Sequence, residues 1–112
     1  MINWERVNTL RDEVGAEDFD EVVELFLDEV EEVMTRLQTS PDLNTLEEDL
    51  HFLKGSALSL GFQSFSALCQ AGESLSADGG ASDVNMAEIL TDYAKSKRLF
   101  QEQKHDALVG QP

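Results

Sequence analysis

Apolar residues recur along the chain at steps of three and four, the spacing of a helix that buries one face. Between breaks rich in glycine, proline and aspartate, this period predicts five helices. They are expected over residues 4–14, 18–37, 40–60 and 62–77, with a last one that is capped by Ser82 and frays near Gly110. Four substantial helices joined by short loops predict an all-α fold, an antiparallel four-helix bundle with an additional short N-terminal helix.

The second predicted helix begins at Asp18, where Glu21 stands three positions on as in a capping box. Leu25 and Leu27 fall off its apolar stripe and are expected to contact the first helix or a partner. The residues expected to face inward are Phe19, Val22, Val23, Phe26, Val30, Val33 and Leu37.

The third predicted helix starts at Ser40-Pro41-Asp42, which combines a cap residue, a first-turn proline and an acid at the positive end of the helix dipole. Gly61 provides its stop. A seam of apolar residues runs along it at alternating steps of three and four: Leu43, Leu46, Leu50, Leu53, Ala57 and Leu60.

The last two helices carry similar stripes. The inward residues of the fourth are expected to be Phe65, Leu68, Cys69, Gly72 and Leu75. Those of the last are expected to be Met86, Ile89, Leu90, Tyr93, Ala94 and Phe100.

Size and composition predict one domain. The chain has 112 residues, 41% of them hydrophobic, which suffices for one modest core. We expect a single domain over 1–112, with a capping helix within 1–15 and the bundle over 18–108. A formal net charge of -15 argues against nucleic acid or an anionic membrane as a partner. One cysteine and no apolar N-terminal run favour a cytoplasmic protein, which we expect to be a monomer.

Candidate chemistry gathers around His51. A helical wheel at about 100° per residue turns His51 away from the middle of the leucine seam, so its side chain is expected to face solvent. Lys54, Gly55 and Leu58 lie three, four and seven positions on and share this side of the helix. Lys54 is also the only lysine or arginine between Arg36 and Lys95.

Phosphoryl transfer is a chemistry that these residues suit. Imidazole, whose ordinary pKa is about 6.5, is largely an unprotonated nucleophile near neutral pH. Lys54 can offset the charge of a phosphoryl group with a charge-assisted hydrogen bond. Glycine inside a helix costs about 1 kcal/mol relative to alanine, and nothing in the seam explains Gly55. It is expected to clear space for the active site of another protein.

The segment from His51 to Phe62 resembles the signature of histidine phosphotransfer (HPt) domains; it reads HFLKGSALSLGF. The resemblance extends to residues 10–15, 25–27, 68–69 and Glu73, about two-thirds of the chain, while the last helix matches only in pattern. It implies that His51 is the phospho-acceptor, Lys54 the phosphate-stabilising residue, Gly55 the clearance for the partner and Gly61 the bend into the next helix.

The resemblance also implies a stoichiometric phosphocarrier that is not an enzyme. HPt domains relay phosphoryl groups between aspartates of receiver domains, and the receiver supplies the Mg²⁺, so no cofactor is expected here. The chain has no Gly-rich loop of the P-loop type and no kinase signature, which agrees with a carrier that has no ATP site of its own. The implied partners are receiver domains and a hybrid sensor histidine kinase, and the chain is either a free-standing carrier or an excised domain.

Further residues have a possible part in the site. Glu47, one turn before His51, is a candidate to hydrogen-bond the imidazole and set its tautomer, and Glu73 holds a family position near the acceptor. For both, an ordinary solvated glutamate is the alternative. Because HPt domains dock receivers through an apolar patch near the histidine, Leu27, Phe52 and Leu58 are the candidate docking residues.

Two other functions compete. Glu48-x-x-His51 and Glu102-x-x-His105 have the spacing of di-iron four-helix proteins, but the wheel turns both glutamates away from the core, so no metal site is expected. His105 is interpreted as a surface residue. The second rival is a helical adaptor that binds partners without covalent chemistry and gives His51 no special role.

Overall fold

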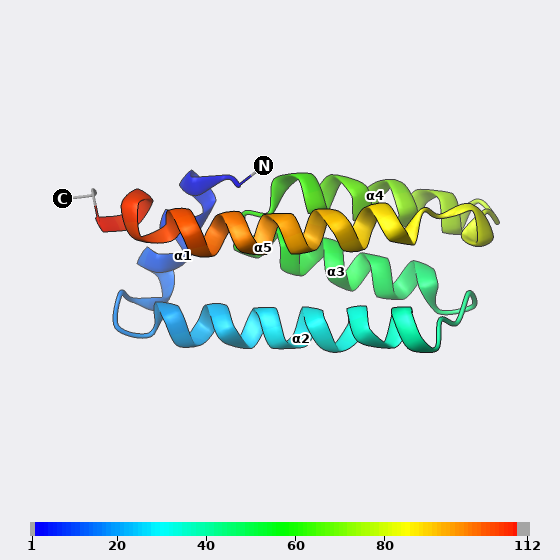
Figure 1. Cartoon of the computed structure of the whole chain (residues 1–112), viewed down its shortest axis with the longest axis horizontal. Coiled ribbons are helices and arrows are strands. Elements are labelled where there is room, and N and C mark those ends of the chain that lie inside the picture. The colour runs from blue at the N-terminus through cyan, green and yellow to red at the C-terminus, as the bar shows by residue number, and fades with distance from the viewer. Residues whose placement is uncertain (1, 110–112) are drawn as a thin grey trace.

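Helices make up almost the whole of the computed structural model, which describes residues 2–109 and the side chains of residues 2–104. The elements are α1 (Trp4–Val14), α2 (Phe19–Thr39), α3 (Leu46–Leu60), α4 (Gln63–Ala77), a 3-10 turn η1 (Ala81–Asp83) and α5 (Met86–Val109). Figure 1 shows α2 to α5 running back and forth along the long axis, with α1 crossing one end. The predicted all-α bundle with a short N-terminal helix is confirmed.

The helices of the bundle differ in length, and α1 compensates for the difference. α3 and α4 have 15 residues each, whereas α2 has 21 and α5 has 24. At about 1.5 Å per residue, the inner pair ends roughly 10 Å before the longer helices do. α1 packs at this end, where Trp4 stacks on Phe100 with ring centroids 5.5 Å apart and Val7 is buried.

A tight turn at Gly61 and Phe62 joins α3 to α4. Gly61 has a φ of 76°, in the left-handed region, and the Phe62 N–H donates back to the Ala57 carbonyl at 2.9 Å. The Asn3 N–H donates to the Gly61 carbonyl at 2.7 Å, which ties the turn to the chain just before α1. The turn reverses the chain so tightly that α3 and α4 form the most closely packed helix pair of the described structure.

The start of α3 differs from the sequence-based prediction. The helix begins at Leu46 rather than at Ser40, and Leu43, expected in the seam, is 53% exposed. The Asp42 side chain accepts a hydrogen bond from the Asn44 N–H at 2.9 Å, and the Thr45 hydroxyl donates to the Asp42 carbonyl. These local bonds hold residues 42–45 in a turn that competes with the first turn of a helix. The rest of the seam is buried as predicted.

The inward face of α2 is rotated from the predicted one. Leu27 is only 6% exposed and belongs to the core, so its assignment as a residue off the stripe was wrong. Val22, Phe26 and Val33 are only partly buried, whereas Met34 is buried. Leu25 lies off the core-facing stripe, as predicted, and is 57% exposed. The residues that face the core are Phe19, Val23, Leu27, Val30, Met34 and Leu37.

Three smaller predictions were also wrong. Asp18 precedes α2 without a side-chain capping bond. The last helix begins at Met86, and the side chain that caps it is that of Asn85, which accepts from the Glu88 N–H at 3.1 Å; Ser82 lies in η1 instead. Leu75 and Ala94, both expected inside, are exposed.

Gly55 in α3 and Gly61 in the turn after it are expected to respond in opposite ways to substitution by alanine. A Cβ on Gly61 would lie 2.6 Å from the Asn3 carbonyl oxygen in a backbone conformation that strains L residues, whereas a Cβ on Gly55 would have nothing within 4 Å. We expect Gly61→Ala to lower the free energy of unfolding by about 2–4 kcal/mol. Gly55→Ala should raise it by about 0.5–1 kcal/mol. Urea denaturation of both variants checks this, and equal effects of the two substitutions would contradict it.

Candidate phosphotransfer site

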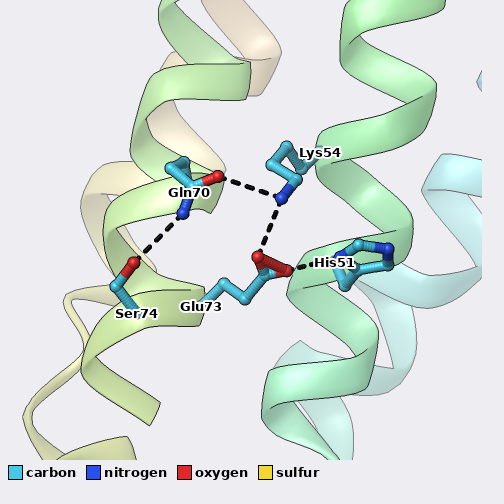
Figure 2. Close-up of polar contacts among 5 residues, drawn as sticks. All are labelled: His51, Lys54, Gln70, Glu73 and Ser74. Atoms are coloured by element: carbon cyan, nitrogen blue, oxygen red, sulfur yellow. Dashed lines mark hydrogen bonds and ion pairs between the residues drawn. The ribbon is translucent and has the colours of Figure 1, made fainter. Parts of the chain in front are cut away.

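The site is built around the His51 side chain, which is 72% exposed on α3. Its Nδ1 lies 2.6 Å from Oε2 of Glu73 on α4. Figure 2 marks this contact between the two helices with a dashed line. The Glu73 side chain is itself only 13% exposed, so the carboxylate is held in the groove between the two helices. The imidazole is therefore anchored on one nitrogen by a neighbouring helix while most of the ring faces solvent.

Lys54 reaches across to the same helix. Its Nζ lies 2.8 Å from Oε1 of Glu73 and 2.9 Å from Oε1 of Gln70. The Lys54 side chain is only 19% exposed although it shares the solvent-facing side of the helix with His51, because its stem lies between the helices. The two oxygens of Glu73 are thus divided, one for His51 and one for Lys54 (Figure 2).

The turn at Gly61 sets these pairings. Lys54 and Gln70 lie eight residues on either side of Phe62, and His51 and Glu73 lie eleven residues on either side. In two antiparallel helices joined by so short a turn, residues equally far from the turn stand at the same level. One left-handed residue therefore brings both pairs together.

The electrostatics of the site assign a role to each imidazole nitrogen. The Lys54 ammonium, by its hydrogen bond, lowers the pKa of Glu73; desolvation opposes this shift, and the bond to His51 adds to it. Glu73 is then a carboxylate at neutral pH, and a carboxylate oxygen only accepts hydrogen bonds. The hydrogen of a neutral His51 ring therefore sits on Nδ1, and Nε2 keeps its lone pair.

The predicted site residues are distributed as follows. Gly55, Phe52 and Leu58 are exposed near His51 on α3, the last two by 40% and 57%, and no atom outside the helix backbone approaches the position of a Gly55 Cβ. Leu27 lies in the core and cannot offer its side chain to a docking partner, so that assignment needs correction.

The carboxylate that bonds the imidazole is Glu73, not Glu47. Glu47 is exposed and lines a hollow beside the ring together with Glu48, His51 and Glu73, but its carboxylate makes no hydrogen bond to His51. The sequence named both glutamates as candidates, Glu47 by its position on the same helix and Glu73 by the family resemblance. The signal that favours Glu73 is its symmetric position across the Gly61 turn.

The metal alternative finds no support in the geometry. Glu48 and Glu102 are both exposed, as the wheel predicts, and the side chain of His105 lies outside the described part of the chain. Within residues 2–104, no three His, Cys, Asp or Glu side chains converge as metal ligands would.

Cys69 is buried on α4 as a free thiol. Burial, with smaller contributions from Asp92 and Glu73, raises the pKa of this thiol to about 12. The thiol stays protonated at neutral pH, which agrees with its interpretation as core filling.

Comparison with known families identifies this helical bundle as a domain of the phosphotransfer class. The family model of the Hpt domain matches residues 21–101, and the chain therefore belongs to this family. Hpt domains take part in phosphorelays as phosphocarriers rather than enzymes, and they interact with receiver domains. Comparison with curated proteins found no match, and neither did comparison with solved structures. None of the described helices is long and apolar enough to cross a membrane.

A titration tests the ion pair at the centre of the site. Because Lys54 is the main cause of the lowered Glu73 pKa, we expect Lys54→Met to raise that pKa toward its ordinary value. The sign follows from the loss of a cation that favours the charged carboxylate. Carbon-detected NMR titration of the Glu73 side chain measures it, with Lys97→Met, which removes a lysine from Glu31, as the matched control. An unchanged Glu73 pKa in Lys54→Met would contradict the arrangement.

Proposed function

We propose that the chain accepts a phosphoryl group on Nε2 of His51 and passes it between aspartates of receiver domains in a two-component phosphorelay. The observation that carries the proposal is the bond between Glu73 and Nδ1, which in a neutral His51 ring places the hydrogen on Nδ1 and directs the Nε2 lone pair outward on a side chain that is 72% exposed. Membership of the Hpt family supports it.

The proposed step is a displacement at phosphorus. The Nε2 lone pair of His51 attacks the phosphorus of a receiver aspartyl phosphate, an N–P bond forms, and the P–O bond to the aspartate breaks. The aspartate leaves as a carboxylate with the bonding electron pair. The hydrogen on Nδ1 stays in its bond to Glu73, which stabilises the positive charge that develops on the ring. The reverse of this step delivers the group to a second receiver.

Three neighbouring residues have supporting roles in this proposal. Lys54 offsets the charge of the incoming phosphoryl group. Phe52 and Leu58 offer apolar surface to the receiver, and a hollow of about 360 Å³ opens beside Leu58 between α1 and the end of α3. In this proposal the receiver brings the Mg²⁺, a hybrid sensor histidine kinase is the upstream source, and the carrier acts as a monomer in the cytoplasm.

A labelling experiment tests the acceptor. A receiver domain charged with radioactive phosphate by a small phosphodonor should transfer label to the wild-type chain, and the label should be acid-labile and base-stable. His51→Gln should take up none, because the amide has no nucleophilic nitrogen. The chain contains two histidines, so His105→Gln is the matched control and should be labelled normally.

The outcomes separate the proposal from its rival. Label on His51→Gln, or none on the wild type with every receiver of the source organism, would overturn the proposal. A helical adaptor would bind its partner equally well as wild type and as His51→Gln, and neither would carry label.

Gly55 allows a test of partner approach. Gly55→Gln places a long side chain one turn from His51, where a Cβ meets nothing within the chain itself. We expect transfer from a receiver to slow at least about tenfold, a loss typical of a misplaced reacting group. Direct labelling by phosphoramidate, a small donor, should stay unchanged. Ala94→Gln, on the exposed side of α5, is the control and should leave both rates as they are. Equal slowing with both donors would contradict a role in clearance.

A further inference from the structure

Gln70 is a polar residue of the site that neither the phospho-acceptor chemistry nor the docking surface accounts for. It lies on α4, one turn before Glu73, and its Oε1 accepts a hydrogen bond from the Lys54 ammonium at 2.9 Å. Its own side-chain N–H donates to Oγ of Ser74 at 3.1 Å, which turns the amide so that its oxygen, not its nitrogen, meets Lys54 (Figure 2).

The contacts of Lys54 leave one direction open. An ammonium has three N–H donors, and among the described residues two of them point to Oε1 of Gln70 and Oε1 of Glu73. With two acceptors on a rigid helix, the Nζ position and the direction of the third N–H are fixed together. With Glu73 alone, the ammonium would keep the freedom to swing about a single bond.

The neutral charge of Gln70 matters as much as its oxygen. The chain has 23 acidic residues, yet the second acceptor of its isolated lysine is an amide. With a neutral His51 ring, the charges of Lys54 and Glu73 cancel, so the group carries no net charge. An acid at position 70 would hold the ammonium equally well and would leave a negative charge beside the place where a phosphoryl dianion must sit.

From these contacts we infer that Gln70 is a positioning residue for phosphoryl transfer, which aims Lys54 at a phosphoryl group on His51 without adding negative charge. This inference rests on the proposed function of His51. It assigns the lysine a support on α4, and it makes the residue type at position 70 a determinant of how much phosphoryl group the carrier holds at equilibrium.

The test measures the equilibrium share of label between a charged receiver and this chain. Gln70→Leu should lower the label on His51 about three-fold, because Lys54 loses one of its two supports. Gln70→Glu should lower it about three- to tenfold at low salt, and the loss should shrink in about 0.5 M NaCl because salt screens the added charge. Gln38→Glu, which adds the same charge to an exposed position near the end of α2, should change it less than two-fold.

A double-variant cycle shows whether Gln70 acts through Lys54. In a Lys54→Met background, Gln70→Leu should have no further effect on the label, whereas independent contributions would multiply. Urea denaturation of each variant separates these effects from stability. Labelling equal to wild type in both Gln70 variants, equal losses in Gln70→Glu and Gln38→Glu, or an undiminished effect of Gln70→Leu without Lys54 would overturn the inference. A wild-type chain that takes no label would instead overturn the proposed function itself.

Discussion

The left-handed turn at Gly61 is the constraint on which the rest of the site depends. The helix period determines which residues share one face of a helix. It does not determine which residues of the next helix lie opposite them. The turn removes that freedom, because so short a link between α3 and α4 permits one register, in which His51 faces Glu73 and Lys54 faces Gln70. The chemistry of α3 is thus completed by side chains of α4 that a loop a few residues longer would place a turn away.

At this level of the α3–α4 pair, a single carboxylate, that of Glu73, contacts both His51 and Lys54. Glu73 accepts one hydrogen bond on each of its two oxygens, which explains why a largely buried carboxylate is stable beside an exposed ring. Two other ion pairs also join neighbouring helices. Arg36 pairs with Asp49 between α2 and α3, and Lys97 pairs with Glu31 between α5 and α2. The pair at Lys54 differs from these because its carboxylate, Glu73, also bonds an exposed imidazole, that of His51.

The sequence allowed prediction of the helices and of the outward residues on α3, because period and glycine stops are local signals. His51, Gly55 and Leu58 are exposed where the wheel places them. The position of Leu27 was not predictable in the same way, since apolar residues cover a wide arc of α2 and the neighbouring helices decide which of them the core accepts. The start of α3 depends on side-chain bonds of Asp42 and Thr45, which outweigh the helix-start pattern of Ser40-Pro41-Asp42.

Glu73 and Gln70 required tertiary information of another kind. Their partners are 22 and 16 residues away in the sequence, so their roles follow only after the length and geometry of the turn are known. Glu47 was a candidate because it lies on the same helix as His51, and Glu73 because the family resemblance places it near the acceptor. The structure shows that Glu73 bonds the imidazole.

The packing of α1 has a consequence for where this domain ends. The family match begins at residue 21, after α1, yet Asn3 bonds the Gly61 carbonyl and Trp4 covers Phe100. A fragment cut at the borders of the match would retain His51, Lys54, Gln70 and Glu73 and would lose the segment that holds the turn between α3 and α4. The segment that the family model matches is therefore shorter than the set of helices that pack together in the structure, which includes α1.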